Sequence, residues 1–364
     1  MISDKCGREN TMEGQNVIKN ERIQWIDIGR GIGILLVILG HAVSGPVREV
    51  SGGAELIYNF IYFFHMGLLM YLSGYMYKKN EERYLKKGIK KVIGNKFKQL
   101  MIPYIVYSFL VFLVFSGAHK IEKLSAVLSN SDYGQLSFVK WFMGMGIGNN
   151  IYSIHLWYIY ALFVMIILTL CIKKVFGKKS RLCVVLTAIV FYLIKRNINL
   201  DDMGIINHVM TNYYWFAIGM CIDLETIGKN KVKIIAIICL IYRLITINMP
   251  IRLPGTIGVY VMYVVNIFAA VGIIFGFLLI AKKVSGKVKS ILMYLGKNSF
   301  GIYLFHQPFW GSGIGMICIK VLHAPPLIAV IAAMVLSILI PIIIIKILNT
   351  PLLKKVSFLL LGSK

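Results

Sequence analysis

Apolar runs of about 20 residues recur along the whole sequence and constrain its fold more than any other feature. A helix of about 20 apolar residues crosses the hydrocarbon core of a bilayer. Charged residues make up 15% of the 364-residue chain, well below the share of a typical soluble domain. We predict spans at 25–43, 57–77, 102–118, 154–172, 182–195, 206–222, 233–248, 257–281, 299–321 and 327–348. The sequence therefore predicts an all-α, polytopic transmembrane helical bundle of about ten spans.

The positive charge of the chain predicts its orientation. The sequence has 40 Lys and Arg residues against 15 Asp and Glu residues, a net charge of +25. This charge is scattered over short loops, which argues against a nucleic-acid-binding domain. With both termini cytoplasmic, the inner segments hold three quarters of the basic residues and the outer loops hold one fifth. Cytoplasmic loops of membrane proteins carry such an excess. We therefore expect a plasma-membrane protein with cytoplasmic N- and C-termini.

The chain divides into one membrane domain and two polar ends. Residues 1–22 contain no apolar core of a signal peptide, and we expect a disordered cytoplasmic tail. The transmembrane domain is predicted at 23–350, followed by a cytoplasmic tail at 351–364. Between two spans, the segment 81–100 places apolar residues at helical spacing among lysines, which predicts a basic amphipathic helix on the inner membrane surface. This helix either anchors the topology or also gathers an anionic cytosolic substrate. The six cysteines lack paired CxxC spacing and are interpreted as small core residues.

The first span carries three ionisable groups within an otherwise apolar stretch. It is WIDIGRGIGILLVILGHAV at 25–43, with Asp27, Arg30 and His41. Arg30 and His41 are eleven residues apart, so they return to within about 20° of one helix face, about 16 Å apart along the axis. Asp27 precedes Arg30 by three residues and can pair with it. Such groups line a polar cavity or form a structural pair with a packed histidine; the spacing alone leaves both interpretations open.

Other polar and aromatic residues of the predicted spans are candidates for the lining of the same cavity. Ser299, Tyr303 and His306 follow one helical stripe with spacings of four and three. His65 is either a cavity residue or a packed histidine, and Trp157 is either a site residue or an interfacial aromatic beside His155. Arg243, within the seventh span, needs a partner or a path to the interface. The histidines show no metal-ligand spacing such as HExxH, so we predict no metal.

Four segments together resemble the membrane-bound acyltransferase family 3, which includes bacterial polysaccharide O-acetyltransferases and fucose 4-O-acetylase-like proteins. The first is the pattern Asp27-x-x-Arg30-Gly31 followed by His41. The others are FFHMGLLMYLSGY at 63–75, HLWYIYAL at 155–162 and NSFGIYLFHQPF at 298–309. All four stand in the family's order and extend over nearly the whole chain. One departure is Gly67, which stands where the family's second segment usually has proline.

The resemblance implies an O-acyltransferase that moves an acyl group from cytosolic acetyl-CoA, or another acyl-CoA, to a hydroxyl of a cell-surface or lipid-linked carbohydrate. Arg30, braced by Asp27, is then the donor contact, with Arg243 as a further one. His41 is the catalytic residue, either as the base that takes the hydroxyl proton or as a group acylated on the way. The acceptor or cavity lining would include His65, His155, Trp157, Ser299, Tyr303 and His306. No bound cofactor is expected.

A transport function is the main alternative. Some members that this chain resembles are regarded as glycan exporters or flippases, and a polar stripe inside a helical bundle serves transport as well as catalysis. Acyl transfer by the purified protein would favour the enzyme, whereas glycan translocation without acylation would favour export.

Overall fold

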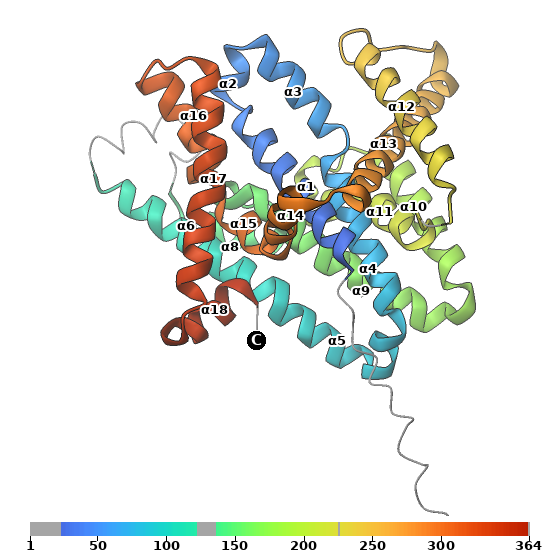
Figure 1. Ribbon diagram of the computed structural model, residues 1–364. Helices are drawn as coiled ribbons and strands as arrows, with labels where there is room; N and C mark the ends of the chain where they lie inside the picture. The colour runs from blue at the N-terminus through green and yellow to red at the C-terminus, as the bar shows by residue number, and fades with distance from the viewer. Residues whose placement is uncertain (1–22, 122–135, 225, 363–364) are drawn as a thin grey trace, which may run out of the picture.

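The computed structural model describes residues 23–121, 136–224 and 226–362, and all regular structure within these ranges is helical (Figure 1). The first half contains α1 (Gln24–Ala42), α2 (Pro46–Glu49), α3 (Gly52–Tyr62), α4 (His65–Lys87), α5 (Ile89–Lys96), α6 (Ile102–Ala118), α8 (Phe138–Ile147), α9 (Trp157–Phe176) and α10 (Ser180–Asn197). The second half contains α11 (Ile205–Cys221), α12 (Lys229–Thr246), α13 (Gly255–Lys283), α14 (Gly286–Lys297), α15 (Ser299–Phe305), α16 (Ile314–Met316), α17 (Pro326–Leu348) and α18 (Lys354–Leu361). The all-α prediction is confirmed for these residues.

Six helical stretches of the described chain are long and apolar enough to cross a membrane. They are Gln24–Ala42, Gly52–Lys87, Ile89–Ala118, Phe138–Asn197, Gly255–Lys283 and Pro326–Leu348. The predicted count of about ten, and the cytoplasmic position of the termini, stay predictions. Two predicted spans are interrupted: 57–77 by the turn between α3 and α4, and 299–321 after α15, where Pro308 has no N–H to donate.

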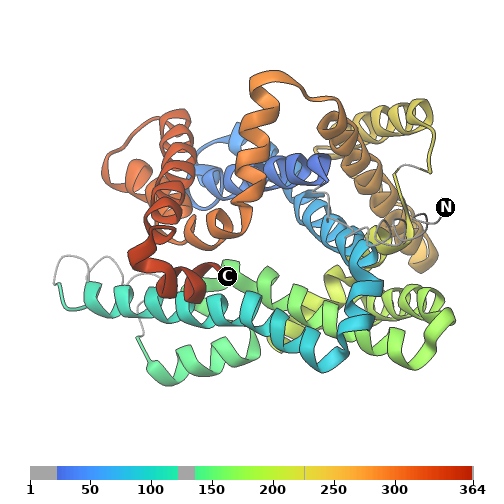
Figure 2. The ribbon, with the colours of Figure 1, turned by 60° about the horizontal axis from the view of Figure 1, so that its bottom comes forward.

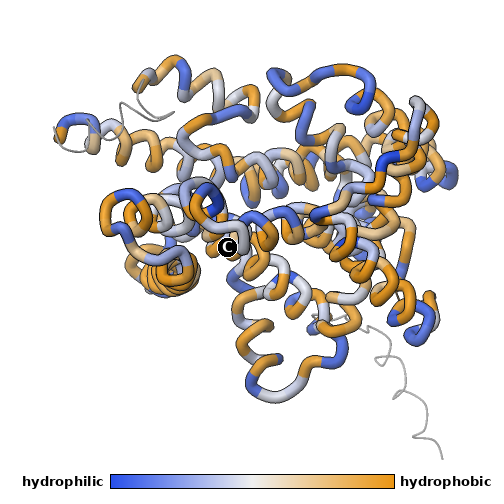
Figure 3. Tube along the Cα trace, turned by 90° about the horizontal axis from the view of Figure 1, so that it is seen from above, coloured by the Kyte–Doolittle hydropathy of each residue, from blue (hydrophilic) through white to orange (hydrophobic). Residues whose placement is uncertain are grey.

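Apolar side chains cover the outside of the bundle as well as its interior. On α17, Leu327, Ile331, Val335, Leu339 and Ile343 recur every four residues and are each exposed by 45% or more. Figure 3 shows hydrophobic residues along most helices, with hydrophilic residues gathered largely at their ends and turns. A soluble protein rarely exposes so continuous an apolar surface, whereas a lipid-facing helix requires one.

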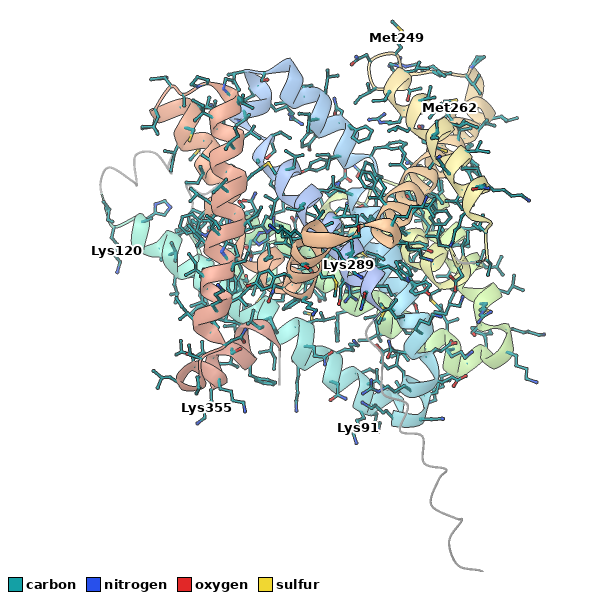
Figure 4. All side chains as sticks on the ribbon, in the orientation of Figure 1. Lys91, Lys120, Met249, Met262, Lys289 and Lys355 are labelled. Carbon is teal, nitrogen blue, oxygen red and sulfur yellow. The ribbon has the colours of Figure 1, made fainter. Side chains whose placement is uncertain are left out.

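Two lysines from segments far apart in the sequence lie at one edge of the molecule. Lys91 of α5 and Lys355 of α18 both lie at the lower edge in Figure 4, opposite Met249. Both lysines belong to segments predicted to face the cytoplasm. The predicted amphipathic segment 81–100 is helical, but it is divided at Gly88, whose φ of +79° favours glycine.

The structure describes most of the predicted C-terminal tail but not the predicted N-terminal tail. Residues 1–22 lie outside the described residues. The end of the chain is helical up to Leu361, because α18 packs against α6 and α17. Gly362, with a φ of +60°, closes α18 beside the Gln99 carbonyl, where a Cβ would lie 2.5 Å from that oxygen. The C-terminal segment is thus part of the packed structure.

Helices α1 and α14 touch through their backbones, and this contact positions the first span. A Cβ on Gly31 would lie 2.1 Å from the Leu292 carbonyl oxygen, and one on Gly296 would lie 1.7 Å from that of Asp27. Only glycine permits such an approach. Figure 1 shows α14 crossing in front of α1, and Figure 2 shows the same crossing turned by 60°. The crossing brings Arg30 next to the start of α15.

Candidate active site

Arg30 lines a cavity of about 270 Å³ between α1, α4, α9 and the start of α15. Lys96 and Lys297 also line this space, which we call the Arg30 cavity. Its remaining polar lining comes from Ser73, Tyr158, Ser299 and Tyr303. The Ser73 and Tyr158 hydroxyls lie 3.0 Å apart and share a hydrogen bond. Three cations around one cavity form a site for an anionic group.

His41 lies at the other end of α1 and packs against the residue that follows α15. The ring centroids of His41 and His306 are 5.2 Å apart, and those of His306 and His155 are 5.5 Å apart. His306 and His155 are buried, whereas His41 is only partly buried. Arg30 and His41 therefore both face the segment 299–307, as the eleven-residue spacing predicts. We call His41, His155 and His306 the histidine cluster.

Hydrogen bonds to backbone carbonyls orient the buried histidines. His306 Nδ1 lies 2.7 Å from the Tyr303 carbonyl oxygen, and His155 Nε2 lies 3.3 Å from that of Leu304. A carbonyl only accepts, so in neutral His306 the proton sits on Nδ1 and Nε2 presents a lone pair. His306 Nε2 is buried and makes no hydrogen bond to any residue that the structure describes. A buried acceptor without a donor is rare in folded proteins and is found at functional sites.

Gln307 orients His41. When the Gln307 side-chain amide is placed with its oxygen toward the imidazole, His41 Nδ1 donates a hydrogen bond of 3.2 Å to it. The same amide bonds the Ser312 hydroxyl, and the Gln307 carbonyl accepts a 2.6 Å hydrogen bond from the Tyr107 hydroxyl. Both ends of Gln307 are thus held in place. The proton on Nδ1 leaves Nε2 of His41 as the acceptor, the arrangement that a general base requires.

Tyr303 joins the Arg30 cavity to the histidine cluster. Its side chain lines the cavity, and its hydroxyl donates to the His155 carbonyl. Its ring centroid is 5.6 Å from that of His306 and 5.4 Å from that of Tyr158. The stripe therefore runs from the cationic cavity, which Ser299 and Tyr303 line, to His306 in the histidine cluster; its role as one polar wall stays a prediction.

The sequence of the chain is similar to those of known proteins. An acyltransferase domain, described as acyltransferase family 3, matches residues 23–346, which is most of the chain. The chain belongs to the acyltransferase 3 family. The nodulation protein NolL of Mesorhizobium japonicum is 30% identical over 100 residues, which are 27% of this chain and 26% of that protein. The chain thus matches about a quarter of that relative's length. No solved structure matches the chain.

In this acyltransferase 3 family member, the four remaining predicted site residues lie in four different places. Asp27 is buried on α1 beside α14, and its pairing with Arg30 stays a prediction. His65 is buried, with Nδ1 2.8 Å from the Ile61 carbonyl oxygen. Trp157 stacks on His208 with ring centroids 4.7 Å apart. Arg243 lines a different cavity from Arg30, so the structure does not bring these two arginines together.

Three residues of the site are not among the site residues predicted from the sequence. Gln307 follows His306 in the segment that carried the resemblance, yet its spacing gives no sign that it contacts His41. Lys96 and Lys297 reach the Arg30 cavity from segments that the sequence analysis interprets as topology signals. Their role follows only from the packing of α1 against α14 and of α5 near α9.

The acyltransferase 3 chain shows no cluster suited to a metal ion among its described residues. No group of three or more His, Cys, Asp and Glu side chains there has the arrangement of a metal site.

Proposed function

We propose that this membrane acyltransferase is an O-acyltransferase that transfers an acyl group, preferably acetyl, from cytosolic acyl-CoA to a hydroxyl of a cell-surface or lipid-linked carbohydrate. The observation that carries the proposal is the continuity from the Arg30 cavity through Tyr303 to the histidine cluster. It links a cationic cavity to a positioned imidazole. The family membership supports the acyl transfer itself.

The Arg30 cavity suits the anionic part of the donor. Arg30, Lys96 and Lys297 complement phosphate groups, and the planar guanidinium of Arg30 can bind two phosphate oxygens at once. Lys96 and Lys297 belong to segments predicted to face the cytoplasm, where acyl-CoA is dissolved. The pantetheine arm then extends along α1 and brings the thioester to His41.

His41 handles the proton of the acceptor. As the acceptor hydroxyl oxygen attacks the thioester carbonyl carbon, Nε2 of His41 takes the hydroxyl proton. The carbon–sulfur bond breaks, and the departing CoA thiolate takes up that proton. In a two-step route, Nε2 attacks the thioester carbonyl carbon and the carbon–sulfur bond breaks to release CoA thiolate. The acceptor hydroxyl oxygen then attacks the acyl carbon, the bond to Nε2 breaks, and the thiolate takes up the hydroxyl proton. Gln307 keeps Nε2 directed at the substrate in either route.

His41→Ala tests the proposal. In purified protein supplied with acetyl-CoA, we expect release of free CoA thiol to fall about 10²–10⁴-fold, the range for loss of a general acid–base residue. His323→Asn is the matched control, because His323 is an exposed histidine with a φ of +48° that asparagine tolerates. Full acyl transfer by the His41 variant would contradict the assignment. Glycan translocation by a wild-type protein that transfers no acyl group would favour an exporter.

A further inference from the structure

A second cavity, of about 370 Å³, opens among α3, α10, α11, α12 and α13, away from the Arg30 cavity. The residues on which the argument depends are Tyr62, Tyr192, Arg196, Trp215, Arg243 and Tyr263. We call it the Arg196–Arg243 cavity. The ends of α10 and α12 that form it are predicted to lie on the outer side. Figure 4 shows Met262, next to Tyr263, toward the same edge as Met249 and opposite Lys91 and Lys355.

Two arginines give this cavity a positive charge, and no carboxylate of the described residues lines it. The Arg196 guanidinium lies 3.8 Å from the centre of the Tyr263 ring, and that of Arg243 lies 4.4 Å from the centre of the Phe63 ring. Both cations are thus held by aromatic faces and not neutralised by an acid. The cavity is built to receive an anion.

Arg243 is also anchored and has donor capacity left over. Its Nη2 donates a hydrogen bond of 2.6 Å to the Asn59 carbonyl, which fixes the guanidinium. Its Nε is buried and makes no hydrogen bond to any described residue. A buried N–H without a partner is costly, and Nη1 of the same fixed guanidinium is not buried, makes no hydrogen bond to a described residue and stays available to a ligand. A carboxylate, with its two oxygens, is a suitable acceptor.

Aromatic rings supply the rest of the cavity wall. Tyr192, Trp215 and Tyr263 line it from three different helices, and Tyr62 closes it from a fourth. Such rings combine a flat apolar face with a polar edge, so they pack against the C–H face of a sugar ring while hydroxyls bond its oxygens. A free inorganic anion would need the arginines but not these rings. The combination fits a sugar that carries a carboxylate.

Gly67 makes the position of Trp215 possible. A Cβ on Gly67 would lie 2.9 Å from Cδ2 of the Trp215 ring, closer than real Cβ contacts. Gly67 is also the position at which the chain departs from the proline usual in the family's second segment. The departure thus coincides with a tryptophan in the wall of the Arg196–Arg243 cavity.

Tyr62 separates this cavity from the reacting end of α1. Its Cε2 lies 3.1 Å from where a Cβ on Gly40 would be, and Gly40 directly precedes His41. The ring centroids of Tyr62 and His65 are 4.8 Å apart. One aromatic ring therefore lies between the cavity and the helix end that carries His41, so a saccharide bound there lies beside the proposed reaction centre.

We propose that the Arg196–Arg243 cavity binds the carboxylate-bearing sugar unit of an acidic saccharide acceptor on the outer side of the membrane. The carboxylate is held by Arg196 and Arg243, and the sugar ring packs against the partly exposed Tyr263 ring, with the buried Trp215 as part of the wall behind it. This inference rests on the proposed acyl-transfer function. It adds the chemical class of the acceptor and moves Arg243 from the predicted donor contacts to the acceptor site.

The test is a binding measurement on the full-length protein in lipid nanodiscs, without any donor. The two probes are a tetrasaccharide of alternating glucuronic acid and N-acetylglucosamine, and the same tetrasaccharide with its carboxylates reduced to hydroxymethyl groups. We expect the wild-type protein to bind the carboxylate form at least ~10-fold more tightly, which corresponds to ~1.4 kcal/mol. This comparison of two probes needs no variant and so does not depend on the folding of a mutant.

Matched variants assign the preference to the cavity. Arg196→Gln and Arg243→Gln are expected to remove the preference for the carboxylate form, whereas Tyr263→Ala weakens binding of both forms. Arg252→Gln, which removes an exposed arginine outside the cavity on the same predicted side, is the control and keeps the preference. Equal binding of the two probes, an equal loss in the Arg252 variant, or displacement of the carboxylate form by equimolar inorganic phosphate would overturn the proposal.

Failure of this inference is distinguishable from failure of the proposed function. Thiol release from acetyl-CoA by the wild-type protein is measured separately. If His41-dependent release occurs and the two probes bind equally, the acceptor inference is wrong and the acyltransferase proposal stands. If the carboxylate probe binds selectively and no acyl group is ever transferred, the acyltransferase proposal is wrong and the cavity remains a saccharide site.

Discussion

The Arg30 cavity and the Arg196–Arg243 cavity are both cationic, but they are built in different ways. The first is formed mainly by segments that resemble the family's motifs, with Lys96 and Lys297 added from outside them, and its first span is pressed against α14 through two glycines. The second is formed mainly by helices between those motifs and is walled by aromatic rings. The difference suggests a division of labour, in which motif residues handle a common donor and intervening residues recognise a particular acceptor.

Among the variants that test this division between the cavities, the largest expected effect concerns the donor side. Arg30→Gln removes a charge-assisted contact, so we expect the KM for acetyl-CoA to rise about 10–100-fold, from a loss of about 1.5–3 kcal/mol. The measurement is steady-state thiol release over a range of acetyl-CoA concentrations, with Arg252→Gln as the control. If Arg30→Gln weakened saccharide binding more than it raised the KM for the donor, the assignment of donor and acceptor to separate cavities would be wrong.

Gln307→Leu is expected to have a smaller effect, about 10-fold, and on kcat. The leucine cannot accept from Nδ1 of His41, so the imidazole loses its fixed orientation while the cationic lining is untouched. A split between kcat and KM distinguishes positioning from binding, and Gln307→Glu, which retains an acceptor oxygen, is expected to recover part of the rate. A rise in KM with unchanged kcat would show that Gln307 contacts the donor instead.

The smallest expected effect, a few-fold, is that of Gly67→Ala on acidic-saccharide binding. The added methyl group meets the Trp215 ring and shifts it within the cavity wall. Gly94→Ala is the matched control, because no heavy atom lies within 4 Å of a Cβ at that position. Titration of the carboxylate tetrasaccharide measures the effect. A loss as large as that of Arg196→Gln would mean that Gly67 supports the bundle as a whole.

The sequence predicted those parts of the fold and site that depend on spacing along one element. The eleven residues between Arg30 and His41 predicted a common face, and both residues do meet the segment 299–307. The stripe from Ser299 to His306 was predicted in the same way. Hydropathy likewise predicted the long apolar helices. It did not predict the turn at Phe63 and Phe64, because both residues are as apolar as the helices beside them.

What the sequence could not predict depends on contacts between elements distant in the chain. The Gly31–Leu292 contact places Lys297 beside Arg30, and neither residue's local sequence specifies the other. The neighbours of Arg243 could not be predicted for the same reason. Within its helix it is simply a partly buried cation, and only the arrangement of α10, α12 and α13 around one cavity shows that it shares that cavity with Arg196 and not with Arg30. The sequence predicts that Arg243 binds the donor, and no observation tests this role. The acceptor proposal assigns Arg243 to saccharide binding instead.

The uninterrupted course of α1 has a consequence for the choice of donor. A helix holds its side chains at a fixed rise of about 1.5 Å per residue, so the offset of about 16 Å between Arg30 and His41 changes only if the helix unwinds. In the proposed reaction α1 therefore fixes the distance between the donor-binding residue and the catalytic residue. A donor fits only if the length of its pantetheine arm, from its phosphate groups to its thioester, matches this offset. This requirement does not depend on which acyl group the donor carries.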